Sequence, residues 1–591
     1  MGVKAETERI LSIPRIPETV DRKVPAWVRG RCERPSGTMS LFFLQLVALH
    51  EAFLAQGLLG SLPVGSGKTL LSGLLPHMFD LPEGRDAHLF VPASAVDKTY
   101  RELAEYDEHF YISRRLWVHS YGKLSNIHTG PDLLDKLQPG LLLFDECHKL
   151  ANPSSVSWVR VMRWMQEHQD TRACAFSGTP MKSKLEDMAH IAGLCLRQQA
   201  PVPLEWIAVQ PWSKTLSDDT GFNYASRKDW QAMQPLVDAF GDDAPADLLT
   251  LPVRDRREHV REAFRHRLDT TRGVVLSRSM SSEEALTIEV LDLPVPGDVA
   301  HALEDLEELW MRPDGEFLTG ALFVSAVGQQ LSQGFHYYWD WPDGEVDTEW
   351  LTKRAAFNKA VAAITKSKRY GKDSPGAVYK EMRKAAALLA FAQRGGQTGF
   401  DRVGLAAATP GLVAEDETLW AAFEGWAEQR DKQKPPTLAT WVDTFLIDDV
   451  VRRVREVDEP TLVWYSHGAT ADALEAAGIE VVRPKESPCE DRPRTLALSI
   501  KSHATGLNLQ GWPRSIVLCA PGSNLQWEQL IGRQHRNGQR TPVTVQVYGH
   551  TKYLRNPLEK ALLVARQEER TKGAPQKLTF ANWAGMPLTP K

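Results

Sequence analysis

The amino-acid sequence predicts an α/β fold that contains two parallel sheets. Short apolar runs that suit buried strands alternate with helical stretches in two regions, residues 37–200 and 441–560. Strands that are buried on both faces and separated by helices form parallel sheets with helices on the outside. Residues 201–440 show no clean alternation, and they contain many Trp and Pro residues and several charged helical stretches. We therefore expect two α/β lobes with a mainly helical insertion between them.

Length, composition and charge agree with that division. A chain of 591 residues exceeds one compact domain, and 42% hydrophobic and 25% charged residues are typical of globular proteins. Residues 1–36 are rich in Pro, Arg and Glu and are expected to form an N-terminal arm, and residues 561–591 a C-terminal tail. The formal net charge of -5 excludes an overall basic surface, so a surface for nucleic acid would be a local patch.

The cysteines and the N-terminus indicate an intracellular setting. None of the six cysteines forms a Cys-x-x-Cys pair, so neither a zinc site nor a disulfide framework is indicated. Scattered cysteines suit a reducing compartment. The N-terminus lacks the apolar core of a signal peptide, and no apolar run is long enough to span a bilayer. We expect a cytoplasmic protein that has no membrane partner.

A glycine-rich stretch in the first region has the pattern of a phosphate-binding loop. The stretch Leu62–Thr69 follows the apolar run 57–62 and leads into a helical run, so it reads as strand, turn and helix. Gly65, Ser66 and Gly67 would point backbone N–H groups at a phosphate, at the positive end of the helix dipole. Lys68 would reach the β- and γ-phosphates of a nucleotide, and Thr69 would hold Mg2+. Leu62 departs from the full pattern, which has glycine there; the alternative is a glycine-rich turn that happens to precede a lysine.

Polar residues follow two further predicted strands of this region. The apolar run 140–144 leads into Asp145-Glu146-Cys147-His148, and the run 172–176 leads into Ser177-Gly178-Thr179-Pro180. Ligands of parallel sheets bind at the carboxyl ends of the strands, where both tetrads fall. We assign Asp145 to Mg2+ and Glu146 to orienting and deprotonating the attacking water.

A glutamine precedes the phosphate loop on a predicted helix, residues 41–50. An amide side chain pairs with both the donor and the acceptor edge of adenine, so Gln45 is a candidate contact for the base. The alternative is an ordinary polar residue on a helix face.

The second region has predicted strands but no phosphate loop. It has five apolar runs, at 461–465, 479–482, 495–500, 515–519 and 543–548, and Leu286–Leu291 is expected to be an isolated strand before it. Residues 526–539 read as a helix on which Gln529, Arg533 and Arg536 share one face. Two arginines aimed at a cleft can stabilise the charge of phosphoryl transfer. The alternative is a surface helix with salt-bridged arginines.

Together these motifs resemble helicase superfamily 2. Gly-Ser-Gly-Lys-Thr, Asp-Glu-Cys-His and Ser-Gly-Thr-Pro occur in the order of its motifs I, II and III. The stretch 526–545 resembles motif VI of its chromatin-remodeller-type (switch/sucrose-nonfermenting-like) translocases, and Ser502–Leu509 resembles motif V. The resemblance covers roughly 37–200 and 440–550, with Val274–Arg278 a looser match, and the lean chain is similar to prokaryotic or phage-encoded members.

The resemblance implies two RecA-like lobes that bind ATP and Mg2+ between them and nucleic acid across them. By resemblance, His148, Ser177 and Thr179 couple nucleotide state to nucleic acid, and Gly506 lies near the nucleotide. The expected function is an ATP-dependent translocase on DNA, with double-stranded DNA favoured. An unwinding helicase on DNA or RNA stays open, as does an inert binding scaffold, which only Leu62 supports. A nucleotide kinase would lack the second lobe.

Several other features have both a functional and a structural interpretation. Basic clusters at Arg254–Arg267 and 366–372 would contact phosphates or be solvated helix faces. Trp339 and Trp341 would stack on bases, although packing is the commoner role. Tyr121 is a candidate for a position near the nucleic-acid track.

Overall fold

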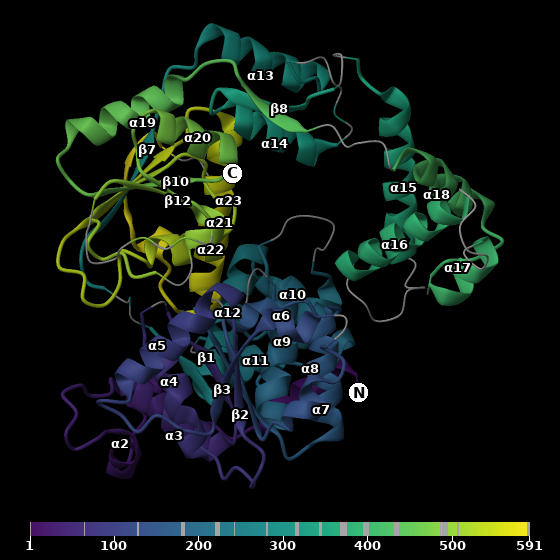
Figure 1. Cartoon of the computed structure of the whole chain (residues 1–591). Coiled ribbons are helices and arrows are strands. Elements are labelled where there is room, and N and C mark those ends of the chain that lie inside the picture. The colour runs from purple at the N-terminus through teal and green to yellow at the C-terminus, as the bar shows by residue number, and fades with distance from the viewer. Residues whose placement is uncertain are drawn as a thin grey trace.

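The computed structural model describes residues 2–587, with gaps. The gaps are 64, 127–128, 179–183, 219–224, 242, 279, 281, 314–317, 319, 342–344, 367–374, 394–400, 410, 431–435, 485, 487, 489–493 and 505–506. The chain forms two parallel sheets flanked by helices, and a helical region projects from the second (Figure 1). We call the sheets with their covering helices lobe 1 and lobe 2.

Lobe 1 is built on a six-stranded sheet in which every strand pair is parallel. The order is β3-β2-β4-β5-β1-β6, so the strand before the glycine-rich loop lies next to the strand before Ser177. The strands are β1 (Leu58–Ser61), β2 (Ala87–Val91), β3 (Leu116–Ser120), β4 (Leu141–Asp145), β5 (Arg172–Ser177) and β6 (Val274–Leu276). The three strands predicted from the runs 57–62, 140–144 and 172–176 are confirmed as β1, β4 and β5.

Two helical layers cover the two faces of this sheet, and each encloses an apolar core. One layer comprises α2 (Ala26–Cys32), α3 (Phe43–Ala55), α4 (Lys68–Leu74) and α5 (Val96–Tyr106). The other comprises α1 (Val3–Ser12), α6 (Tyr121–Ser125), α7 (Leu133–Leu137), α8 (Val156–Glu167), α9 (Glu186–Leu196), α10 (Trp206–Leu216), α11 (Arg227–Phe240) and α12 (Val253–Asp269).

Lobe 2 is built on a seven-stranded sheet, also parallel throughout, with the order β11-β12-β10-β13-β14-β7-β15. Its strands are β7 (Leu286–Leu291), β10 (Thr461–Tyr465), β11 (Val481–Val482), β12 (Leu496–Ser499), β13 (Arg514–Val517), β14 (Val543–Tyr548) and β15 (Asn582–Gly585). Helices α19 (Phe445–Glu456) and α20 (Gly468–Ala476) pack on one face. The other face carries α21 (Ile500–His503), α22 (Asn524–Ile531), α23 (Lys552–Lys572) and α24 (Lys577–Phe580).

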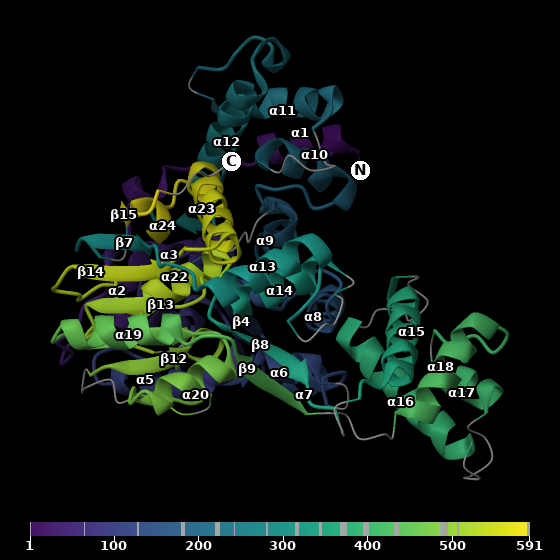
Figure 2. The same ribbon diagram turned by 90° about the horizontal axis from the view of Figure 1, so that it is seen from above.

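The region between β7 and α19 is an insertion into lobe 2. Helices α13 (Gly297–Leu309) and α14 (Ala321–Leu331) share a small core beside the lobe. An antiparallel ribbon of β8 (Phe335–Trp339) and β9 (Thr437–Trp441) then leads to a separate helical bundle. That bundle stands apart from both sheets in two views (Figures 1 and 2) and has its own core; it comprises α15 (Thr348–Lys366), α16 (Pro375–Gln393), α17 (Arg402–Ala408) and α18 (Glu417–Gln429).

Trp339 and Trp341 belong to the joint between the ribbon and this bundle. Their rings lie 5.9 and 5.8 Å from the ring of Trp350 in edge-to-face contacts. The guanidinium of Arg354 lies over Trp339. The structure therefore gives these two aromatics a packing role.

The expected boundaries at 200, 440 and 560 do not coincide with the limits of the sheets. β6 and β7 come from the expected insertion, and β15 from the expected tail. The prediction of an isolated strand at Leu286–Leu291 is wrong, because β7 pairs with both β14 and β15. Long-range pairing of this kind leaves no local signal in the sequence.

The N-terminal residues, which were expected to form an arm, pack against lobe 1. Arg22 is buried, and its Nη1 donates to the backbone oxygen of Val274 in β6 at 2.6 Å. Thr19 donates through its hydroxyl to buried Asp269. The N-terminal segment therefore closes one edge of lobe 1.

Two arginines of the basic stretch 254–267 face inward. Arg267 Nη1 donates to the backbone oxygen of Ile13 at 3.0 Å, and Arg261 Nε donates to that of Leu216 at 3.0 Å. These side chains stabilise lobe 1, so the prediction of a phosphate contact is wrong for them.

Of the second predicted basic cluster, 366–372, residues 367–372 lie outside the residues that the structure describes. Among the described helices, none has the length and apolar character needed to cross a membrane.

Candidate functional site

The glycine-rich loop joins β1 to α4 as predicted. Gly65 and Gly67 have φ angles of +89° and +76°, in the left-handed region that suits glycine, and Gly67 caps the N-terminus of α4. Leu62 is only 2% exposed and packs in the core of lobe 1. Its departure from the motif therefore lies before the turn and leaves the two glycine conformations in place.

Gln45 holds this loop through its side-chain amide. Its Oε1 accepts a hydrogen bond from the backbone N–H of Phe42 at 2.9 Å, and its Nε2 donates to the backbone oxygen of Ser66 at 3.0 Å. A Cβ on Gly67, whose φ is +76°, would lie 2.2 Å from Gln45 Nε2, so a side chain there would strain the backbone and displace the Gln45 amide. Gln45 also lines a cavity of about 420 Å3 together with Phe42 and Ser66. Its contact with a base stays a prediction.

Asp145 and Glu146 lie where β4 ends. Glu146 has a φ of +52°, and its backbone N–H donates to Asp145 Oδ1 at 2.9 Å. The hydroxyl of Tyr121 donates to the backbone oxygen of Asp145 at 2.8 Å. Tyr121, predicted near a nucleic-acid track, thus supports the turn that carries the two carboxylates.

Glu146, His148 and Ser177 form a connected cluster. The Ser177 hydroxyl donates to Glu146 Oε2 at 3.1 Å, and Oγ lies 3.1 Å from His148 Nδ1. His148 Nδ1 lies 3.3 Å from the same Glu146 oxygen. The structure thus joins the tetrads after β4 and β5, as their positions at adjacent strand ends imply. Thr179, which was assigned with them, lies outside the described residues.

The side chain of Lys68 also lies close to the carboxylate of Glu146. Its Nζ donates to the backbone oxygens of Leu62 and Pro63 at 3.2 and 3.3 Å and lies 3.9 Å from Glu146 Oε1. Burial raises the pKa of Asp145 to about 7, and the charge of Glu146 adds to the effect. Burial also acts to raise the pKa of Glu146, but Lys68 and His148 outweigh it and hold that pKa below its usual range. Lys68 and His148 thus favour the ionised form of Glu146.

Lobe 2 brings one of the two predicted arginines to this loop, and the two do not share one helix. The prediction of a helix to residue 539 is wrong, because α22 ends at Ile531 and the residues after it form turns. Arg533 is buried, and its guanidinium donates to the backbone oxygens of Ala504, Leu507 and Gln529 at 2.9 to 3.2 Å. Its contacts within lobe 2 hold the loop before β13 against α22.

Arg536 is the arginine that reaches the glycine-rich loop. A Cβ placed on Gly65 would lie 3.3 Å from Arg536 Cβ and 3.5 Å from its Nε. Arg536 thus packs on the loop backbone across the boundary between the lobes. Gln529 lies at this boundary too, on α22. Gly506, the remaining predicted residue, lies outside the described residues.

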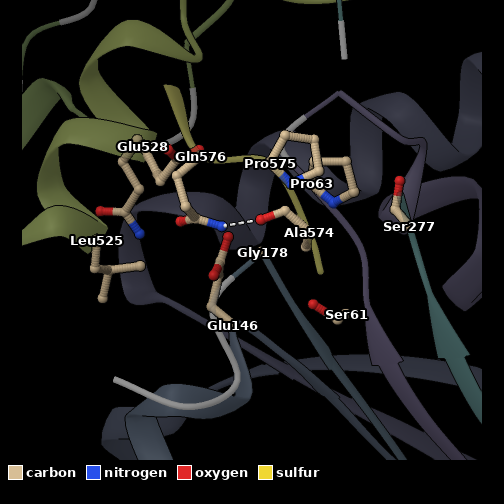
Figure 3. Close-up of a pocket in the computed structure, with 11 residues that line it drawn as sticks. Ser61, Pro63, Glu146, Gly178, Ser277, Leu525, Glu528, Ala574, Pro575 and Gln576 are labelled. Carbon is tan, nitrogen blue, oxygen red and sulfur yellow. Dashed lines mark hydrogen bonds between the residues drawn. The ribbon is translucent and has the colours of Figure 1, made fainter. Parts of the chain in front are cut away.

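Two hollows at the boundary between the lobes adjoin these residues. A cavity of about 860 Å3 is lined by His148 and Lys149 of lobe 1 and by Lys501 and Gln529 of lobe 2. A much smaller cavity, of about 20 Å3, is lined by Glu146 and by residues 574–576, which follow α23 (Figure 3). Sequence reasoning missed 574–576, because nothing local distinguishes them from a tail.

The donor groups suit a hard divalent cation. Thr69 lies in the first turn of α4 and offers a hydroxyl, and Asp145 offers a carboxylate at the end of β4. Oxygen donors of this kind are the ligands that Mg2+ prefers. The pair therefore fits the predicted assignment of Thr69 and Asp145 to Mg2+.

The chain matches none of the protein-family models and none of the curated protein sequences.

Proposed function

We propose that this protein is an ATP-dependent DNA translocase built from two RecA-like lobes, of the kind found in helicase superfamily 2. The observation that carries the proposal is the packing of Arg536 from lobe 2 on Gly65 of the glycine-rich loop in lobe 1. A phosphate loop on one parallel sheet and an arginine from a second sheet are the two halves of a site for phosphoryl transfer. A kinase with one sheet would have no use for the second half.

In this proposal the residues of lobe 1 bind and activate the reactants. Backbone N–H groups of Gly65, Ser66 and Gly67 hold the phosphates of ATP, and Lys68 leaves its carbonyl partners for the β- and γ-phosphates. Bound Mg2+, held by Thr69 and Asp145, would neutralise charge on the phosphates. Glu146, held ionised beside Lys68 and His148, orients and deprotonates the attacking water.

Nucleic acid is assigned to the larger cavity between the lobes. Lys149 and Lys501 approach it from opposite lobes, and His148 connects it to Glu146 through the cluster with Ser177. Lysines that neutralise backbone phosphates bind without reading sequence. A change in the separation of the lobes would move these two contacts relative to each other, which is the action that a translocase needs.

The test is steady-state ATP hydrolysis by the purified chain, alone and with duplex DNA, single-stranded DNA or RNA. We expect stimulation by duplex DNA and loss of hydrolysis by about 100-fold or more in Lys68→Ala. Lys560→Ala, an exposed lysine on α23, is the matched control and should hydrolyse at the parental rate.

Each result of this test has a defined meaning. Hydrolysis at the parental rate in Lys68→Ala would refute the proposal. Stimulation by single strands or RNA alone would replace the duplex translocase with a strand-separating helicase, for which the separate bundle α15–α18 would be the candidate splitting element.

A further inference from the structure

The chain after α23 returns to lobe 1 and enters the candidate active site. Arg265 of α12 donates through Nη1 to the backbone oxygen of Arg570 at 3.3 Å, and Arg570 lies 3.7 Å from Glu258. The helix ends at Lys572 and is capped by Gly573, which has a φ of +72°. After this glycine the chain turns, and Ala574 and Pro575 lie between Pro63 of lobe 1 and α22 of lobe 2 (Figure 3).

Gln576 is the polar residue of this segment, and hydrogen bonds hold both the oxygen and the nitrogen of its side-chain amide. It is 2% exposed. Its Oε1 accepts a hydrogen bond from Asn524 Nδ2 at 2.9 Å, and its Nε2 donates to the backbone oxygen of Ala574 at 3.0 Å. The next residue is anchored as well, since the backbone N–H of Lys577 donates to Glu528 Oε1. The orientation of the amide is therefore determined by lobe 2.

The held amide points toward the carboxylate of Glu146 (Figure 3). Both side chains line the cavity of about 20 Å3, together with Ser61, Gly178 and Gln529. A cavity of this size has room for about one water, which needs two to four polar partners. An amide nitrogen carries two hydrogens, so Gln576 Nε2 keeps one donor after its bond to Ala574.

We propose that Gln576 orients the attacking water at Glu146. The inference rests on the proposed function. In the reaction, the water oxygen forms a bond to the γ-phosphorus and its proton passes to the Glu146 carboxylate. The bond between the γ-phosphorus and the bridging oxygen breaks, and its electron pair leaves with ADP. A Gln side chain that orients water is a known device of nucleotide hydrolysis.

This position also links hydrolysis to the arrangement of the lobes. Gln576 follows a helix that contacts α12 of lobe 1, whereas Asn524, which holds its amide, belongs to α22 of lobe 2. A relative movement of the lobes would displace Gln576 from Glu146. The C-terminal segment would then make water activation depend on closure of the lobes.

The alternative is that Ala574–Gln576 block the site and leave it when ATP binds. The two interpretations predict opposite changes in turnover. If Gln576 orients water, replacing it lowers kcat; if the segment blocks the site, weakening its anchor raises kcat or lowers KM for ATP.

The experiment compares Gln576→Met, which keeps the volume and removes the amide, with Gln576→Asn, which keeps the amide on a shorter side chain. We expect kcat for ATP hydrolysis to fall by about 100-fold in Gln576→Met, with KM and the Kd for ATP within about twofold of the parent. Gln199→Met, at an exposed glutamine of lobe 1, should leave all three unchanged. Circular dichroism checks folding, and Gln576→Asn, with a smaller fall expected, serves if Gln576→Met does not fold.

A double-mutant cycle with Glu146→Gln separates this proposal from the proposed function. Residues that act on one water are not additive, so Gln576→Met should lower kcat little further in the Glu146→Gln background. An unchanged or higher kcat in both Gln576 variants would overturn the role of Gln576. Parental hydrolysis in Glu146→Gln alone would refute the proposed active site, whatever Gln576 does.

Discussion

The two sheets share one architecture but carry different chemistry where their strands end. In lobe 1 the strand ends lead into Lys68, Glu146 and Ser177, which supply an ammonium, a carboxylate and a hydroxyl group. The Glu146 carboxylate lies close to both of the others. In lobe 2 the corresponding side presents Gln529 and Arg536, which approach the groups of lobe 1 from across the boundary. A parallel sheet thus supplies position, and its loops supply function. Under the proposed function neither lobe holds a complete set of groups for phosphoryl transfer, so each lobe is expected to be inactive alone.

The largest expected effect comes from removing the arginine that lobe 2 gives to lobe 1. Arg536→Ala should lower kcat for ATP hydrolysis by about 1000-fold, because an arginine that stabilises the transferring phosphoryl group contributes that much. The Kd for ATP should change far less, since the phosphate loop stays intact. Steady-state hydrolysis and nucleotide binding by the same preparation check both statements.

Arg540→Ala is the matched control, because Arg540 is exposed and lies just after the same turn. It should hydrolyse ATP at the parental rate. If Arg536→Ala did so as well, lobe 2 would not contribute to the chemistry, and the division of labour between the lobes would be wrong.

Arg533 tests the same comparison, because its hydrogen bonds lie within lobe 2 although its charge also helps to lower the pKa of Glu146 in lobe 1. Its guanidinium is buried and donates to three backbone oxygens, so Arg533→Ala would leave buried acceptors without partners. We expect a loss of roughly 3 kcal/mol in the free energy of unfolding of lobe 2. Urea unfolding followed by tryptophan fluorescence measures it. Wild-type stability in Arg533→Ala, with activity lost, would show instead that Arg533 acts on the nucleotide.

The sequence predicted those parts of the site that depend on short-range pattern. Buried apolar runs located β4 and β5, and the polar residues directly after them became the cluster of Glu146, His148 and Ser177. The strand Leu116–Ser120 was missed because its outward side chain Trp117 is half exposed and His119 interrupts the apolar run. Such an edge strand looks like a loop from its sequence.

Other features could not be predicted because they depend on distant partners. The strand at Leu286–Leu291 is held in the sheet by pairing with β14, which follows more than 250 residues later in the chain. The turn after Ile531 interrupts a stretch with good helical spacing, since Arg533 is drawn to the carbonyls of the loop before β13. Gln576 carries no motif, and only the path of α23 brings it to Glu146.

A smaller, pH-dependent effect is expected at the junction that anchors Gln576. Burial lowers the pKa of Lys577 from 10.5 to about 8; Glu528 opposes this shift and Arg536 adds to it. Between pH 8 and 10.5 the unfolded chain holds this proton and the folded chain does not, so the stability of lobe 2 rises with pH. The gain should reach roughly 2 kcal/mol.

Lys577→Met removes this titration and keeps most of the buried volume. Urea unfolding of parent and variant at pH 7.5 and pH 9.5 measures the difference, and the other lysines and tyrosines cancel between the two proteins. The Lys577 Nζ also donates to the backbone oxygen of His535 at 2.8 Å, so the variant loses one bond at every pH. An equal rise with pH in both proteins would show that Lys577 keeps its ordinary pKa when folded.

The smallest effect concerns the helical bundle. Its first half, α15 and α16, and its second half, α17 and α18, carry opposite charge. The sequence of the first half, residues 348–394, has only Glu349, Asp373 and Glu381 as acidic residues against many basic ones, namely Lys353, Arg354, Lys359, Lys366, Lys368, Arg369, Lys372, Lys380, Arg383, Lys384 and Arg394. The second half, residues 401–431, is mainly acidic. If the first half follows the DNA backbone, Lys359→Gln with Lys384→Gln should weaken duplex binding by about 3- to 10-fold and lower the slope of log K against log salt by about 1 to 2.

Both lysines are exposed, and neither lies near the site between the lobes, so hydrolysis without DNA should stay at the parental rate. Lys560→Gln with Arg566→Gln makes the same change of charge on the exposed side of α23 and controls for net charge. Removing a charge that contacts the DNA changes the slope of log K against log salt, whereas removing a charge far from the DNA does not. Equal slopes for the two variants would therefore mean that the basic half is only a solvated surface. A reduced slope for the bundle variant alone would extend the DNA track beyond the two lobes.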